Sequence, residues 1–289
     1  RRHTRYISVT GVQTCALPIS PDNPDDDENK GRPDFSEIFK QFSGMGLNLQ
    51  SLMASLSGQT TPSALSKEMI RDISKKFLTA HGEIPVGVND LVASQEALSI
   101  ADIWINDVTS FPPLPIPDTC ALSRRDWIDS TLAGWEEIAK PLVEGMSQAM
   151  TTMLNENLGE GQENIEIPGL PIPGMNIPKS AIASVLGTFM SSLISTQLGQ
   201  TIGQLSTTVT GSNDVALPLT EPIRPQLIPQ NVALWGQGLE IDETEIRIYL
   251  ALREIAAARL FASTPWLRDY IRHSIATYGK GIRVDISAM

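Results

Sequence analysis

The chain has 289 residues, 33 of them Asp or Glu and 22 Lys or Arg, and a net charge of −11 at pH 7. Because an acidic chain without a basic run repels phosphate backbones, this balance excludes nucleic acid as an expected partner. The sequence also lacks a glycine-rich phosphate loop, a GxSxG nucleophile motif and a CxxC pair, so nucleotide, serine-hydrolase and dithiol chemistry have no support.

We do not expect residues 1–20 to form part of the fold. Val9–Ser20, VTGVQTCALPIS, looks like the translation of a sequencing adaptor. Arginines precede it, but the apolar core of about seven residues that a signal peptide requires does not follow. Without residues 1–20 the net charge is about −14, and Cys120 is the one remaining cysteine, so we expect no intrachain disulfide and a cytoplasmic location. We also expect a fragment, because the sequence stops at Met289 without a helix stop signal.

The rest of the chain divides into four predicted segments. Residues 21–34 are an acidic, proline-containing tail that lacks the apolar side chains to order itself. Residues 35–156 form an N-terminal helical region, 157–178 a Pro/Gly-rich loop, and 179–289 a second, incomplete helical region. Apolar residues at helical spacing in 35–42 predict a short helix that docks on the body, with a membrane-surface anchor as the alternative.

Three helices are predicted in the N-terminal region. Pro62–Ala80 has Ser63 as its cap, Asn89–Ser110 follows, and the extended connector Phe111–Pro117 leads to a helix capped by Ser123. Pro141 predicts a kink or a restart in that last helix near Ile138. The side chains expected to be internal are Leu91, Leu98, Ile100, Ala101, Trp104, Ile105 and Val108 in the second helix, and Trp127, Leu132 and Trp135 in the third.

Ser180–Asn213 contains no charged residue. Serine, threonine and glutamine interrupt its apolar part, whereas a membrane span needs about 20 predominantly apolar residues, so a helix packed in a protein core is favoured over a transmembrane helix. Gly199 and Gly203 form a GxxxG pair, which predicts that another helix approaches closely there.

Asp242–Tyr278 carries the longest helical pattern in the chain. Asp242 can cap the first turn and Glu245 can complete a capping box, while Pro265 predicts a second helix, Trp266–Tyr278, packed back on the first. A wide apolar arc is expected on the first helix, made of Ile246, Tyr249, Leu250, Ala256, Ala257, Leu260 and Phe261.

Arg253 lies within that arc. A guanidinium removed from water needs a carboxylate, so Arg253 is expected either to reach the surface or to meet an acid from another helix. Its neighbour Glu254 projects about 100° away and cannot be that acid.

The run YLALREIAAARLFASTPWLRDYI resembles a segment of an actinobacterial family of zinc-dependent metallopeptidases, also described as zincin-like hydrolases, and WIDSTLAGW at Trp127–Trp135 resembles another. The resemblance covers about Phe35 to Asp285. It implies an HExxH or RExxH motif in which histidines at i and i+4 hold zinc and the glutamate is the general base. It therefore implies Glu254 as the catalytic residue, with a peptide or protein substrate. The two histidine positions are Arg253 and Ala257, neither of which can ligate zinc, so this chain itself supports no metal ligand.

The fold expected from these patterns is mainly α-helical and zincin-like, truncated at the C-terminus. Two functions stay open. The first is a metal-dependent hydrolase with Glu254 as general base. The second is a catalytically silent scaffold or protein-binding module in which Arg253 takes the space and charge of the metal. His81 and His273 are expected to be helix-end or surface residues rather than ligands, and the oligomeric state stays open.

Overall fold

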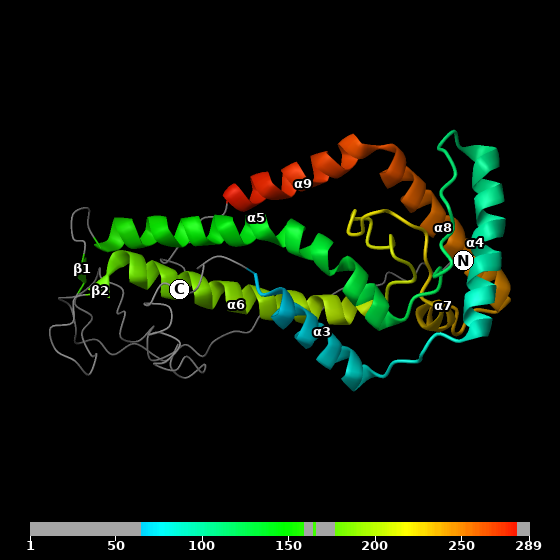
Figure 1. Ribbon diagram of the computed structural model, residues 1–289, viewed down its shortest axis with the longest axis horizontal. Helices are drawn as coiled ribbons and strands as arrows, with labels where there is room; N and C mark the ends of the chain where they lie inside the picture. Colours follow the sequence, from blue (N-terminus) through cyan, green and yellow to red (C-terminus); the bar gives the residue numbers. More distant parts are fainter. Residues whose placement is uncertain (1–64, 159–163, 166–176, 282–289) are drawn as a thin grey trace, which may run out of the picture.

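The computed structural model describes residues 65–158, 164–165 and 177–281. This part of the chain is mainly helical, as predicted (Figure 1). The expectations for residues 1–20, 21–34 and 35–42, and for the interior of the loop 157–178, lie outside it. The helices are α3 (Lys67–His81), α4 (Val88–Val108), α5 (Arg124–Leu158), α6 (Lys179–Ser206), α7 (Pro229–Trp235), α8 (Glu243–Ser263) and α9 (Pro265–Lys280). Two short strands, β1 (Asn164–Ile165) and β2 (Ile177–Pro178), pair antiparallel at the far end of α5 and α6.

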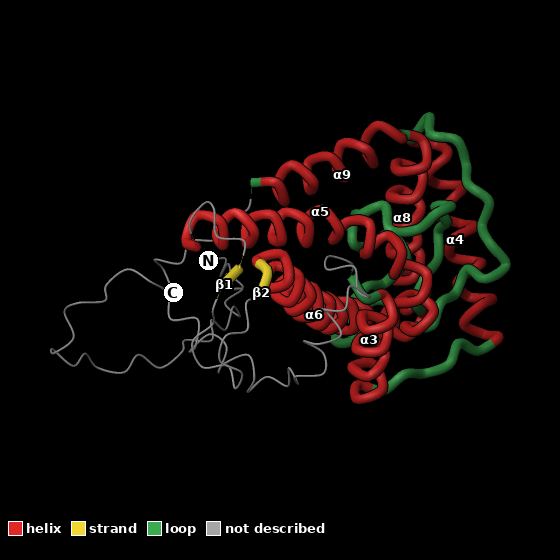
Figure 2. The backbone as a smooth tube through the Cα atoms, turned by 60° about the vertical axis from the view of Figure 1, so that its left-hand side comes forward, coloured by secondary structure: helices red, strands yellow, loops and turns green. Residues whose placement is uncertain are grey.

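The long helices α5 and α6 lie side by side, and their ends near β1 and β2 project beyond α3 and α9 (Figure 1). Figure 2 shows the same helices from another side. Helix α3 packs on α6 at the GxxxG pair. A Cβ at Gly199 would lie 2.9 Å from Ile73 Cβ, and one at Gly203 would lie 2.9 Å from Phe77 Cβ. The two glycines therefore let α3 approach closely, which confirms the prediction made from their spacing.

Helix α9 packs mainly along α5. The prediction that it packs back on α8 holds only for its first turns, where Leu267 and Ile271 lie against the cluster that contains Ala258 and Phe261 of α8. A second glycine contact joins α9 to α5. A Cβ built on Gly145 in α5 would lie 1.9 Å from the Gly279 carbonyl oxygen in α9, and one on Gly279 would lie 2.6 Å from the Pro141 carbonyl oxygen. The backbones of the two helices meet where neither has a side chain.

Helix α5 begins as predicted, because Ser123 Oγ accepts the Asp126 N–H at 3.1 Å and the Asp126 carboxylate accepts the Ser123 N–H at 3.1 Å. Pro141 lies inside one continuous helix, so the predicted restart is wrong, although the helix changes direction along its length (Figure 1). The expected core residues are confirmed: Trp127 and Leu132 are fully buried and Trp135 is nearly so.

Helix α3 starts three residues later than expected from a Ser63 cap. Ser66 is the N-cap: its Oγ accepts the Met69 N–H at 3.2 Å, and its own N–H donates to Ser195 Oγ of α6 at 3.2 Å. A tertiary contact thus selects one of two available serine caps. The other end of the helix falls at His81 and Gly82, as predicted.

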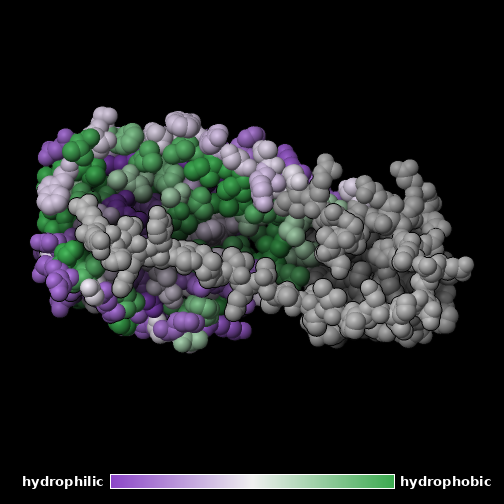
Figure 3. All heavy atoms as spheres, turned by 180° about the vertical axis from the view of Figure 1, so that it is seen from behind, coloured by the Kyte–Doolittle hydropathy of each residue, from purple (hydrophilic) through white to green (hydrophobic). Residues whose placement is uncertain are grey.

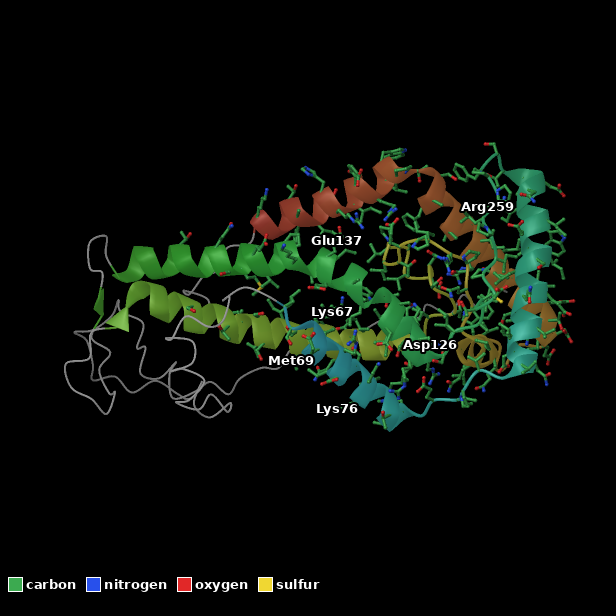
Figure 4. The ribbon with its side chains drawn as sticks, in the orientation of Figure 1. Lys67, Met69, Lys76, Asp126, Glu137 and Arg259 are labelled. Carbon is green, nitrogen blue, oxygen red and sulfur yellow. The ribbon has the colours of Figure 1, made fainter. Side chains whose placement is uncertain are left out.

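Helices α4 and α8 pack together at the opposite end of the molecule from the β1–β2 pair (Figure 1). Their shared core holds Leu98 and Ala101 of α4 with Leu250 and Ile255 of α8. Arg259, which Figure 4 shows between the two helices, is fully buried and donates to the Asp102 carboxylate and to the carbonyl oxygens of Asp102 and Phe111. Trp104 and Val108 of α4, expected to be internal, are 52% and 79% exposed, because α8 covers only one side of the helix.

No helix within residues 65–158 and 177–281 is long and apolar enough to cross a membrane.

Candidate functional site: the motif helix and the loop that covers it

Helix α8 presents the motif positions. It begins as predicted, with Asp242 as N-cap accepting the Thr244 N–H at 2.8 Å. Its buried face differs from the predicted arc. Tyr249 and Leu260 are 50% and 37% exposed, and Ala256 is exposed. The residues that are buried are Ile246, Leu250, Ala251, Glu254, Ile255, Ala258, Arg259 and Phe261.

Because the buried face of α8 is rotated relative to the predicted arc, Glu254 rather than Arg253 faces the interior. Glu254 points inward and is 3% exposed, whereas the Arg253 side chain is 47% exposed. The segment between α6 and α7, residues 207–228, lies over this part of α8 and supplies polar groups to both. A pattern based on apolar residues alone could not find this orientation, because a polar loop rather than an apolar helix covers Glu254.

Four donor groups of the covering segment surround the Glu254 carboxylate. Oε1 accepts from Ser212 Oγ at 2.7 Å, Asn213 Nδ2 at 2.7 Å, the Gln226 N–H at 3.1 Å and the Asn213 N–H at 3.2 Å. Oε2 accepts from the Asn213 N–H at 3.0 Å. The carboxyl group thus fastens the two ends of the loop 212–226 to the middle of α8.

Backbone hydrogen bonds also hold the two ends of this loop together around the Glu254 carboxylate. The Ser212 N–H donates to the Gln226 carbonyl at 3.0 Å, and the Leu227 N–H donates to the Cys120 carbonyl at 2.8 Å. Gly211 lies directly against the carboxylate: a Cβ there would be 2.4 Å from Glu254 Oε2 and 2.8 Å from the Gln226 carbonyl oxygen. Glycine is therefore required at 211 for Glu254 to occupy its position.

Burial raises the pKa of Glu254, and the hydrogen bonds from Ser212, Gln226 and Asn213 oppose the rise. The Ser212 hydroxyl, which has one hydrogen, lies within bonding distance of two acceptors, Glu254 Oε1 at 2.7 Å and the Arg224 carbonyl oxygen at 2.9 Å.

Arg253 meets a carboxylate, as one branch of the prediction required, but that acid comes from the covering loop rather than from a helix. Its Nη2 lies 2.8 Å from Asp214 Oδ1. The other oxygen of Asp214 accepts from the Thr210 N–H at 2.9 Å and from Thr210 Oγ1 at 3.0 Å. Arg253 and Glu254 therefore fasten the same loop from adjacent positions of α8.

Four residues around Glu254 and Arg253 were not predicted from the sequence: Ser212, Asn213, Asp214 and Gln226. One signal could have indicated the first three, because Asp214 is the first charged residue after the uncharged stretch Ser180–Asn213.

The motif positions do not fit a zinc ion. The Arg253 guanidinium is cationic and pairs with Asp214, and Ala257 has no heteroatom. Within the described residues, no group of three or more His, Cys, Asp and Glu side chains is arranged to hold a metal. His81 stacks on Phe77 with ring centroids 4.0 Å apart, and His273 lies on α9 beside Glu137 of α5 (labelled in Figure 4).

The described part of the chain is mainly helical, and its helix α8 carries a buried glutamate, Glu254, enclosed by a polar loop. The chain belongs to the zincin-like metallopeptidase family, whose sequence model matches residues 68–289.

The fold also has a solved relative, a crystal structure of a “putative hydrolase with a novel fold” from Chloroflexus aurantiacus. The two are 17% identical with a TM-score of 0.50, and the match covers 74% of this chain and 59% of that one. The chain thus spans less than two thirds of that protein. No curated protein sequence matches the chain significantly.

Proposed function

We propose that this chain is a catalytically silent member of the zincin-like metallopeptidase family that acts as a helical scaffold for protein binding. In this proposal α8, which carries the metal-binding motif in the family, serves as an anchor for the loop 207–228. The residues at the motif positions keep the helix and the loop together instead of holding a metal.

One observation carries the proposal: the carboxyl group of Glu254 is enclosed by protein donors. A general base must reach the proton of a water molecule or substrate at hydrogen-bonding distance. Glu254 is 3% exposed, and both its oxygens accept from groups of the chain itself. Releasing it would break the loop contacts and leave buried donors of Asn213 and Gln226 unpaired, which is costly.

The Arg253–Asp214 pair supports the same proposal. Where the resembled motif places a metal, Arg253 contributes a permanent positive charge beside the loop carboxylate of Asp214. This ion pair links α8 to the loop, beside the contacts of Glu254.

A second candidate function is a metal-dependent hydrolase acting on peptides or proteins, with Glu254 as general base. Family membership favours it. It requires ligands from residues other than 65–158 and 177–281, and a movement of the loop 207–228 that uncovers Glu254.

Elemental analysis of the purified chain separates the two functions. We expect far less than one zinc per chain in the unmodified protein. We expect zinc to increase in the Arg253→His, Ala257→His double variant, because histidines at i and i+4 share a helix face. Zinc near one equivalent in the unmodified protein would contradict the scaffold proposal and favour the hydrolase.

A further inference from the structure

Two accessible aromatic side chains touch each other where α7 leads into α8. Trp235, the last residue of α7, and Tyr249 of α8 are 42% and 50% exposed, and their ring centroids lie 5.8 Å apart at an interplanar angle of 34°. The turn after Trp235 is held against α8, because a Cβ on Gly236 would lie 2.7 Å from Ile246 Cδ1. The two rings are therefore fixed relative to each other, and both remain accessible.

Large apolar side chains flank this pair in the turn between the helices. Leu234, Leu239 and Ile241 are 45%, 45% and 52% exposed. The chain turns tightly here, since the Gln237 N–H donates to the Leu234 carbonyl at 3.2 Å and the Leu239 N–H donates to the Gly236 carbonyl at 3.1 Å. We call Leu234, Trp235, Leu239, Ile241 and Tyr249 the α7–α8 patch. It belongs to the end of the molecule opposite the β1–β2 pair, where hydrophobic side chains lie among hydrophilic ones (Figure 3, left-hand end).

The charge that accompanies the patch is mostly negative. Residues 229–252 contain four acids and one base. The base, Arg247, pairs with Glu243, and the N-cap acid of α8 accepts a backbone N–H. Glu240 and Glu245 are exposed and pair with no cation among the described residues. Two carboxylates are thus free to meet a cation from outside the chain.

Glu245 lies on the same face of α8 as Tyr249, because residues four apart are neighbours on a helix. A cation that reaches Tyr249 therefore meets a carboxylate beside an aromatic ring. Trp and Tyr rings attract Lys and Arg side chains through their faces, and the attraction is strongest for Trp. Arg253, four residues after Tyr249, is already paired with Asp214. Rings, carboxylates and apolar neighbours together fit a basic side chain that has an apolar side chain next to it.

We propose that the α7–α8 patch binds a segment of a partner protein in which a Lys or Arg stands next to a large apolar residue. The base stacks on Trp235 and Tyr249 beside Glu245. The apolar side chain packs on Leu234 and Leu239. A second copy of this chain would bring the same acids against one another, and anionic lipid surfaces and nucleic acids are repelled by them. The proposal names a partner class for the scaffold function proposed above and rests on it, but its test involves no metal, so the two can fail separately.

The test is a fluorescence-anisotropy titration with a labelled synthetic peptide of alternating Arg and Leu, about eight residues long and about 27 Å when extended. Trp235→Gln removes the larger ring of the patch. The matched control is Trp104→Gln on α4, where the Trp is 52% exposed. Because neither variant changes the net charge, general attraction of the basic peptide to the acidic chain is the same in both.

We expect saturable binding to the unmodified chain, at least about tenfold weaker binding to Trp235→Gln, and unchanged binding to Trp104→Gln. Absence of saturable binding, or equal affinities of the two variants, would overturn the proposal. So would a dimer in sedimentation analysis that Trp235→Gln dissociates, since the occupant would then be a second copy.

If circular dichroism shows that Trp235→Gln does not fold, Glu245→Gln decides. It removes one exposed charge beside Tyr249, and Glu96→Gln on α4 is the control that removes an equal charge elsewhere. We expect Glu245→Gln to weaken peptide binding severalfold and to flatten its dependence on salt more than Glu96→Gln does. Equal effects of these two changes would contradict the proposal.

Discussion

Two neighbouring residues of α8 have opposite environments and the same structural effect. Glu254 is buried under the loop 207–228, and Arg253 is exposed at its rim. Burying a carboxyl group without partners is costly, and here the donors of Ser212, Asn213 and Gln226 offset that cost. Glu254 therefore holds the loop in place, and the loop's donors make the burial of Glu254 possible.

Replacing Glu254 by Ala should lower the free energy of unfolding by about 3–5 kcal/mol, because it leaves several buried donors unpaired. Urea denaturation measures this. Glu96→Ala on the exposed side of α4 is the matched control and should change stability by less than about 0.5 kcal/mol. A Glu254→Ala protein as stable as the unmodified one would show that the hydrogen bonds around the carboxylate contribute little.

The pKa of Glu254 also predicts how stability changes with pH. Burial raises this pKa above its ordinary value of 4.5, so between the unfolded and the folded pKa the native state holds a proton that the unfolded state has lost. The contribution of Glu254 to stability is therefore fully present below about 4.5 and decreases as pH rises through the folded pKa.

Glu254→Gln removes this titration. The stability of the unmodified chain relative to Glu254→Gln should thus fall as pH rises from about 4.5, measured by urea denaturation at a series of pH values. A difference that grows with pH would mean that the hydrogen bonds outweigh burial and that the pKa of Glu254 is lowered.

The sequence predicted one half of this site. It identified the cap at Asp242, the motif positions and a carboxylate partner for Arg253. It placed Arg253 within the apolar arc, with its side chain either reaching the surface or meeting an acid, and the observed side chain does both. It overlooked the burial of Glu254, because the periodicity of apolar residues on α8 does not reveal a face that polar loop residues cover. The role of Glu254 as a general base stays a prediction.

At the scale of elements, glycine contacts decide which helices meet. Gly199 and Gly203 bring α3 onto α6, and Gly145 with Gly279 brings α9 onto α5. The GxxxG spacing on α6 can be recognised within a single stretch of the sequence. The contact between α5 and α9 requires single glycines on two distant helices, and no pattern in either helix alone indicates it.

Gly145→Ala should destabilise the contact between α5 and α9, because its Cβ would lie 1.9 Å from the Gly279 carbonyl oxygen. We expect a loss of about 1–3 kcal/mol in unfolding free energy and faster hydrogen exchange in α9. Gly87→Ala is the control, since its Cβ would meet only Asp90 Oδ2, at 3.4 Å. Equal effects of the two changes would mean that α9 does not depend on this close approach.

The order of helices was largely predictable, because strong caps and breakers mark their ends at Ser123, Asp242 and Pro265. Exposure was less predictable. Trp104 and Val108 read as core residues because α4 is apolar on more than one side, and only the position of α4 at the end of the molecule shows that part of it faces outward.

At the scale of the whole molecule, helix α8 connects the parts. It packs on α4, holds the loop 207–228 through Glu254 and Arg253, and leads through Pro265 into α9, which packs along α5. These contacts make α8 the helix that joins the packed parts of the described chain.

We propose that the motif positions of α8 hold the fold together and do not bind zinc. The most direct test is the thermal unfolding of the metal-stripped chain with and without added zinc. Zinc bound at a native site would stabilise the folded state by about 2.7 kcal/mol at a concentration one hundredfold above its Kd. We predict an unchanged unfolding temperature, and a rise of several degrees that Glu254→Gln and Arg253→Met both alter would contradict the claim.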